Sequence, residues 1–353
     1  MLEIETCFLS TAQYADRESF RLGLMRFRTK KFATDPNEGA SRTSGSSESD
    51  RVSDPSPNAK PRPVQTPLPM PRTLILSDLH LGLPDVPCGR PPRTPETLAP
   101  LFQASDRVIL NGDTADIHHR YHRDQALKLL DATLNLAARS GVSVTCINGN
   151  HDYDLAQLDF VDLFDGAIVV THGHAFSDSM LPWTPAHKII SRTLFAARER
   201  NEKTLEGFLS AAGEASMSQW NEPVTYTEPT ALISIGLNPF RVAKVVAWWR
   251  KYPREAAHFI DRFRPAAKLL VCGHSHRAGS WLVGATPSST RRHVINTGGF
   301  TFPSSPRAVM IDDSSKEIAV ELRAIRHRGG RYELAARENA SCWRIQRPAS
   351  DTR

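Results

Sequence analysis

Short apolar runs, each followed at once by a cluster of polar residues, recur along this chain from Arg72 onward. Runs of this length that are rich in β-branched residues predict strands, and helical patterns such as Asp124–Ala138 lie between several of them. Alternating strand, polar loop and helix indicates a layered α/β fold with its chemistry at the strand ends. The runs and the loops after them are Thr73–Leu76 before SDLHLG, Val108–Leu110 before NGDTAD, Val142–Ile147 before NGNHD, Ala167–Val170 before THGH, and Lys268–Val271 before CGHSHR.

The ends of the chain have a different character from this central part. Ala33–Met70 is rich in Ser, Pro, Asp and Asn and has no aromatic residue, so it cannot bury enough apolar surface to offset its ordering entropy. We expect residues 1–69 to be either a disordered or a mis-called N-terminal extension, the latter with translation starting at Met70. Further strand-like runs follow over Ser280–Ile325, so we expect the domain to span residues 70–330, with a C-terminal tail over 331–353.

A long stretch at about 177–265 separates the THGH loop from the CGHSHR loop. Its pattern is mainly helical, and it is too long for a plain connection inside a compact domain, so it predicts an inserted helical cap. We expect four prolines to break its helices: Pro223, Pro229, Pro239 and Pro253.

Residues 240–252 of this insertion combine an apolar stripe with basic residues. The stripe repeats at i, i+3, i+4 and i+7, which is typical of a helix that packs on a domain core. The alternative is a peripheral membrane contact or a wall of an acyl-chain pocket. The stripe is Val242, Val245, Val246 and Trp249, and its basic neighbours are Arg241, Lys244, Arg250 and Lys251.

Bulk composition excludes several classes of protein. An apolar fraction of 40% and a charged fraction of 23% are those of a globular protein, and no apolar run is long enough to span a bilayer. We see no secretory signal, and the five cysteines form no C-x-x-C pair, so we expect a cytoplasmic location, free or peripheral at the inner membrane surface. A net charge of +6 would suit polyanionic partners, but the charges are spread along the chain, which favours a solvated surface of mixed charge. No obligate nucleic acid partner is evident.

All five strand-end loops carry side chains that can bind metals. Carboxylate, amide and imidazole ligands suit manganese, which we favour, with iron or zinc as alternatives. There are enough ligands for two divalent ions that share one carboxylate, and ions about 3.5–4 Å apart can clamp an in-line displacement at phosphorus. The candidates are Asp78 and His80; Asp113 and Asp116; Asn150, His151 and Asp152; His172 and His174; and His274 and His276.

This ordered set resembles the calcineurin-like metallophosphoesterase superfamily, whose pattern appears here as DLH, GDTAD, GNHD, HGH and GHSH. The resemblance covers roughly Pro71–Arg323. It implies a four-layer α-β-β-α sandwich of two mixed β-sheets flanked by helices, with both metals at one end. It also implies hydrolysis of a phosphodiester or pyrophosphate bond by a metal-bridging hydroxide.

The resemblance also implies roles for individual residues. His151 would be the general acid at the leaving oxygen, and Asp116 would hydrogen-bond His151 and orient it. Asp113 would bridge the two ions. The other ligands would be Asp78, His80 and His276 for the first ion, and Asn150, His172 and His274 for the second.

Three further residues are candidates for substrate binding. His174 either lines the substrate pocket or supports the ligands, and His118 either reaches a substrate phosphate or marks an exposed helix start. Asn296, in the INTGGF segment, either approaches the metals or belongs to a tight turn that its glycines explain.

The long insertion resembles the helical cap of UDP-2,3-diacylglucosamine hydrolases, which implies a phosphorylated small molecule or lipid, such as a UDP-sugar lipid, as substrate. Two features depart from that branch, because it usually has Arg at the position of His151 and HGD in place of HGH. A nucleotide or nucleic-acid phosphodiesterase stays open. A phosphoprotein phosphatase is disfavoured because Ile117 follows Asp116 where that group has Arg. A non-catalytic scaffold with this fold is disfavoured because no ligand is missing.

Overall fold

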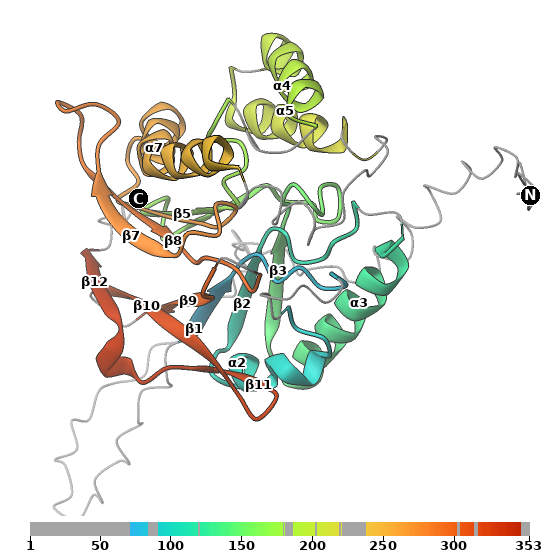
Figure 1. Cartoon of the computed structure of the whole chain (residues 1–353). Helices are drawn as coiled ribbons and strands as arrows, with labels where there is room; N and C mark the ends of the chain where they lie inside the picture. Colours follow the sequence, from blue (N-terminus) through green and yellow to red (C-terminus); the bar gives the residue numbers. More distant parts are fainter. Residues whose placement is uncertain are drawn as a thin grey trace, which may run out of the picture. The chain divides into compact units, whose positions relative to one another are not determined.

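The structure is a computed structural model, and what it describes falls within one compact unit, Leu68–Arg353 (Figure 1). The expectations for residues 1–69, and those for Pro223 and Pro229, lie outside the described residues. The described residues are 71–83, 91–118, 121–178, 180, 186–201, 203–218, 220, 238–301, 304–313 and 317–346.

The first sheet is mixed and has the strand order β11-β10-β9-β1-β2-β3, with β12 paired to β10. Strands β1, β2 and β3 are parallel, and β9 runs antiparallel beside β1. Its strands are β1 (Arg72–Leu76), β2 (Arg107–Asn111), β3 (Ser143–Ile147), β9 (Arg307–Asp312), β10 (Glu317–Arg328), β11 (Arg331–Leu334) and β12 (Ser341–Gln346).

The second sheet is also mixed, with the order β4-β5-β6-β8-β7. Strands β5, β6 and β8 are parallel, while β4 and β7 form its antiparallel edges. Its strands are β4 (Phe160–Leu163), β5 (Ile168–Thr171), β6 (Leu269–Cys272), β7 (Gly279–Val283) and β8 (Arg292–Asn296).

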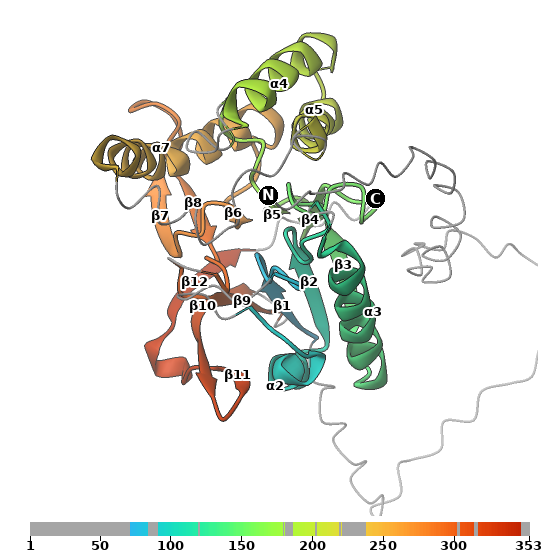
Figure 2. The ribbon, with the colours of Figure 1, turned by 45° about the vertical axis from the view of Figure 1, so that its right-hand side comes forward.

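Apolar side chains on both faces of the central strands build the layers. Ile75 of β1 and Val271 of β6 face each other's sheet and belong to one core cluster between the two sheets. Their neighbours Leu74 and Leu270 point the opposite way, because successive side chains of a strand alternate between its faces. Each sheet therefore has an apolar outer face that helices cover, and the predicted four-layer α-β-β-α sandwich is confirmed (Figures 1 and 2).

Different segments of the chain supply the two helical layers. Phe102 of α2 and Leu130 of α3 pack on the outer face of the first sheet. Leu194 of α4, Leu209 of α5 and Ile260 of α7 pack on the second sheet, so the insertion forms that layer. The helices are η1 (Pro95–Leu98), α2 (Ala99–Gln103), α3 (Arg123–Arg139), α4 (His187–Asn201), α5 (Leu205–Ser218), α7 (Pro239–Phe263) and η3 (Arg337–Asn339).

Helix α7 runs without a break through Pro253, which corrects the expectation that this proline ends a helix. A proline inside a helix lacks the N–H that would bond to the carbonyl four residues earlier. Here that carbonyl belongs to Trp249, and the Arg277 guanidinium donates to it over 3.1 Å. The expectation that Pro239 breaks a helix is wrong as well. Pro239 lies in the first turn of α7, directly after the N-cap Asn238, where proline is tolerated. In the parts of the chain that the structure describes, no helix is long and apolar enough to cross a membrane.

The segment 331–353, expected to be a tail, contributes strands β11 and β12 up to Gln346. Both strands pair with β10, and Ile345 lies directly opposite Ile318. The signal for β12 was the alternation of Trp343 and Ile345 with polar neighbours, which puts Ile345 into the core between the sheets.

The packing of β12 can be tested with two neighbouring residues that face opposite ways. Ile345→Ala is expected to lower the free energy of unfolding by about 2 kcal/mol or more, because it leaves a cavity between the sheets. The Arg344 side chain is 80% exposed and pairs with Glu317 at the surface, so Arg344→Ala should cost less than about 1 kcal/mol. Urea denaturation of both variants measures the difference, and equal losses would contradict the placement of β12.

Candidate metal centre

The five predicted loops meet at one edge of the sandwich. They follow β1, β2, β3, β5 and β6 directly, and the parallel strands within each sheet bring their carboxyl ends to the same side. The Asn111 amide at the end of β2 donates to the Thr171 carbonyl of β5 over 3.1 Å, which joins the two sheets there. Within the second sheet, the Gly273 N–H donates to the His172 carbonyl over 2.9 Å and joins two of the loops. The fold alone therefore brings residues from distant parts of the sequence into one centre.

Several of the predicted ligands have a left-handed backbone conformation. This region is uncommon for residues with a side chain, and such strain persists only where the surroundings hold it in place. The N–H of Asp78 donates to the Gly112 carbonyl over 3.1 Å, and that of His80 donates to the Asp113 carbonyl over 3.0 Å. Ligands with a positive φ are Asp78 (54°), His80 (51°), Asp113 (49°), His274 (62°) and His276 (53°).

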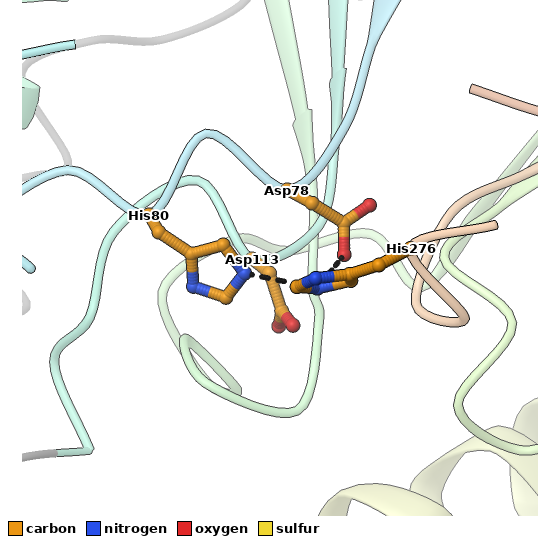
Figure 3. Close-up of side chains that lie close together, drawn as sticks. All are labelled: Asp78, His80, Asp113 and His276. Atoms are coloured by element: carbon orange, nitrogen blue, oxygen red, sulfur yellow. Dashed lines mark hydrogen bonds and ion pairs between the residues drawn. The ribbon is translucent and has the colours of Figure 1, made fainter. Parts of the chain in front are cut away.

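The side chains converge in two groups that share one residue. Asp78, His80, Asp113 and His276 each place a donor atom within 4.8 Å of the others (Figure 3). Asp113, His172 and His274 form a second group by the same measure. Asp113 therefore lies where the sequence analysis expects a bridging carboxylate.

In the first group, hydrogen bonds set the direction of both imidazoles. His80 Nδ1 donates to Asp116 over 2.9 Å, and His276 Nδ1 lies 3.0 Å from the Thr301 hydroxyl. The two Nε2 atoms consequently face each other at 3.2 Å, and His276 Nε2 is 3.1 Å from Asp78 Oδ1. Outer partners of this kind commonly fix the tautomer of histidines that bind metals.

The second group shows the same arrangement. His172 Nδ1 donates to the Asn111 carbonyl over 2.9 Å, which leaves Nε2 directed at Asp113 over 3.2 Å. His274 uses its other nitrogen, because Nε2 lies 3.2 Å from the Met180 carbonyl and Nδ1 lies 2.7 Å from Asn150 Oδ1. Asn150, His172 and His274 thus come together as predicted for the second ion.

Charges in this buried centre depend strongly on one another. Burial raises the pKa of the Asp113 carboxyl, but His172 and His151 outweigh it and hold that pKa well below its usual value. Burial lowers the pKa of the His172 imidazole, whereas Asp113 raises it by more, to about 9. Burial and the neighbouring His172 lower the pKa of His274 to about 3. Asp113 is thus an ionised carboxylate that draws positive charge towards it.

Asp116 connects the first group to His151. Its Oδ1 accepts from His80 Nδ1 over 2.9 Å and from His151 Nδ1 over 2.7 Å. Burial raises the pKa of Asp116, but these two imidazoles lower it by more, so the carboxylate stays ionised. The His151 side chain is 16% exposed, and its backbone N–H donates to Asp113 Oδ1 over 2.8 Å. The structure brings the predicted acid and its orienting carboxylate together beside the ligands.

The three candidate substrate residues have different surroundings. His174 is buried beside His172, and within the described part of the chain neither of its ring nitrogens has a hydrogen-bond partner. His118 stacks edge-on against His151, with ring centroids 4.1 Å apart. Asn296 is fully buried, and its amide binds the Gly273 carbonyl and the N–H of Gly298. Asn296 therefore holds two loops together, and its contact with a substrate stays a prediction.

Three further residues support the site, and the sequence analysis named only Asp152 of them, as a possible ligand. Asp152 accepts from the backbone N–H groups of Asp113 (3.1 Å) and Gly149 (2.7 Å), so it joins two ligand loops. Thr301 holds His276, and the Tyr252 hydroxyl of α7 lies 3.2 Å from the Gly173 carbonyl. Asp152 could be identified from the GNHD motif. Thr301 and Tyr252 belong to no ligand motif, and only the tertiary fold brings them close to the ligand loops.

The residues present fit a pair of divalent ions. The Nε2 atoms of His80 and His276 lie 3.2 Å apart, and Asp78 Oδ1 is 3.1 Å from the latter, so a cation among them could bind all three atoms. In the second group, Asn150 Oδ1 lies 3.3 Å from His172 Nε2 and 2.7 Å from His274 Nδ1, so oxygen and imidazole donors converge there as well. The two clusters with their shared carboxylate therefore support a dinuclear divalent metal site.

Comparison with solved structures finds chains that align with more than three quarters of this chain. A dimetal phosphatase from Danio rerio aligns with 12% identity over 79% of this chain and 100% of its own, at a TM-score of 0.40. A predicted phosphoesterase from Streptococcus pneumoniae TIGR4 aligns with 11% identity over 79% and 99%, at a TM-score of 0.33. Wild-type Vps29 from Entamoeba histolytica complexed with zinc aligns with 11% identity over 78% and 99%, at a TM-score of 0.31. No curated protein matches the chain in sequence.

The family assignment comes from the sequence profile. The profile of the calcineurin-like phosphoesterases matches residues 71–278, which is more than half of the chain and includes all five ligand loops. The chain therefore belongs to the calcineurin-like phosphoesterase family.

Proposed function

We propose that this chain is a metal-dependent hydrolase that cleaves a phosphodiester or pyrophosphate bond in a phosphorylated small molecule or lipid. The observation that carries the proposal is Asp113, which belongs to both ligand groups and also accepts from the backbone N–H of His151. Ligand groups and acid are thereby assembled within one buried centre.

Asp78, His80 and His276 would hold one ion, and Asn150, His172 and His274 the other, with Asp113 common to both. When bound, such ions supply a nucleophile at neutral pH and neutralise charge on the phosphate. Oxygen and imidazole donors without a thiolate support manganese, and the same donors also accept iron or zinc.

His151 would hold the proton and deliver it to the leaving group. Its Nδ1 donates to the ionised Asp116, so the carboxylate stabilises the imidazolium form, whose second proton is on Nε2. That proton can pass to the oxygen of the leaving group. Asp116 acts through His151 and is a positioning residue.

An amphiphilic substrate, such as a UDP-sugar lipid, is supported by the position of α7. The Trp249 indole donates to the Ser275 carbonyl over 2.9 Å, which ties the insertion to the GHSH loop. A helical layer next to the ligands offers apolar surface to an acylated substrate, as the resemblance to UDP-2,3-diacylglucosamine hydrolases implies. His174, buried with both ring nitrogens unbonded within the described residues, is the residue that we assign to a substrate oxygen.

Metal stoichiometry tests the assignment of the ligands. The parent chain should bind about two manganese ions, while His276→Ala and His274→Ala should each retain about one. Asp113→Asn should retain less than one, because its carboxylate belongs to both groups. Mass spectrometry of the dialysed protein measures this, with the exposed Asp131→Asn on α3 as a control that keeps both ions. Loss of a single ion in Asp113→Asn would contradict a shared carboxylate.

Leaving-group dependence tests His151. His151→Asn should lower kcat by about 10²–10⁴ for an alkyl leaving group, which needs a proton, and far less for p-nitrophenolate, which does not. Asp116→Asn should follow the same pattern with a smaller loss. The exposed His258→Asn is the matched control, and an equal loss on both leaving groups would argue against a general acid.

Substrate preference tests the proposed reaction. The full chain with manganese should hydrolyse bis-p-nitrophenyl phosphate faster than p-nitrophenyl phosphate, and UDP-2,3-diacylglucosamine with a kcat/KM at least about tenfold higher than either. All activity should vanish in Asp113→Asn. Metal-dependent diester hydrolysis without turnover of the acylated substrate would reject the lipid class, and two bound ions without any turnover would favour a scaffold.

A further inference from the structure

Helix α7 has two apolar faces, and the core uses one of them. The residues that α7 buries all lie between Trp248 and Ile260, where the helix crosses the second sheet (Figure 2). None of the residues Pro239–Ala247 is buried. The first two turns of the helix therefore have an apolar surface that packing on the sheet does not explain.

The second face forms an open apolar depression of about 520 Å³. Its residues repeat at i, i+3, i+4, i+7, i+8 and i+11, so they form one stripe along the helix, on a different side from Trp248 and Tyr252. Val242 within it is 39% exposed, and Phe240 beside it is 81% exposed. The lining residues are Pro239, Val242, Ala243, Val246, Ala247 and Arg250.

Charge around this stripe has a single sign. No Asp or Glu occurs between Pro239 and Arg254, whereas five basic residues do. A second copy of the chain would bring like charges together on this face, whereas an anionic surface would neutralise them. The basic residues are Arg241, Lys244, Arg250, Lys251 and Arg254.

We propose that the Pro239–Lys251 part of α7 binds the surface of an anionic lipid bilayer. A helix with an apolar stripe and basic flanks lies in the plane of the interface, with its apolar side chains among the acyl chains and its cations at the headgroups. Phe240 and Val242 supply the inserted surface, and Lys244 and Lys251 supply attraction to the lipid phosphates. The proposal does not depend on the reaction at the metal centre.

Co-sedimentation of the full chain with vesicles tests this proposal. Vesicles of phosphatidylcholine mixed with phosphatidylglycerol should bind the chain at least about tenfold more tightly than pure phosphatidylcholine. Binding should weaken as salt rises from about 0.1 M to about 1 M, which shortens the screening length from about 10 Å to about 3 Å. The charge reversal Lys244→Glu with Lys251→Glu should lower the affinity about tenfold or more, and Phe240→Asp should do the same.

Matched controls separate this surface from general charge and hydrophobicity. Lys128→Glu with Lys188→Glu changes the net charge equally, and Phe195→Asp removes an aromatic side chain that is 67% exposed on α4. Both controls, and Asp113→Asn, should bind vesicles like the parent chain. The proposal would be overturned if the chain bound neutral vesicles equally well, or if the control variants lost as much binding. It would also be overturned if the chain formed a dimer that Phe240→Asp dissociates. Unchanged vesicle binding in Phe240→Asp together with a raised KM for the acylated substrate would overturn it too.

Discussion

Burial of four carboxylates in one small volume is the constraint on which the rest of the site depends. Asp78, Asp113, Asp116 and Asp152 are each at most 1% exposed. A buried carboxylate without partners costs several kcal/mol, so every oxygen needs a donor or a cation. Imidazoles and backbone N–H groups meet part of this need, and the strand ends of two sheets are the place where the fold can gather enough of them.

Asp152 shows how this demand determines the local backbone. It takes four backbone N–H groups from two loops, those of Asp113, Thr114, Ala115 and Gly149. These bonds pull the loops so close that a Cβ on Gly149 would lie 2.2 Å from Asp113 Oδ1. The glycine of the GNHD motif is therefore required by the close approach of the Asp113 carboxylate, and the aspartate of the same motif produces that approach.

The sequence was sufficient to predict the layers and the ligands because both depend on local patterns. The consecutive apolar residues Leu74, Ile75 and Leu76 indicate a strand covered on both faces, and a ligand directly after such a strand must lie at the sheet edge. The order of the five loops then predicts which side chains meet, and the structure brings them together.

Features that depend on a partner far along the chain could not be predicted in this way. The continuation of α7 through Pro253 needs Arg277 to bond the Trp249 carbonyl, and nothing near Pro253 in the sequence announces that bond. Asn296 was a candidate for substrate binding because its INTGGF segment could bring a glycine-rich turn near the metals. Its amide is instead used by Gly273 and Gly298, which the fold brings next to it.

Helix α7 supports the ligand loops and also carries an exposed apolar face, and the ligand motifs explain neither property. Its inner face supports the ligand loops, through Tyr252 at the Gly173 carbonyl and Trp249 at the Ser275 carbonyl. Supporting the loops requires only one apolar face. A second apolar face that is exposed to water is unfavourable, and packing among the described residues does not bury it. Because the same helix carries five basic and no acidic residues from Pro239 to Arg254, an anionic amphiphilic surface matches both its apolar and its charged side chains. One continuous helix would then hold the catalytic loops in place at one end and rest on lipid at the other.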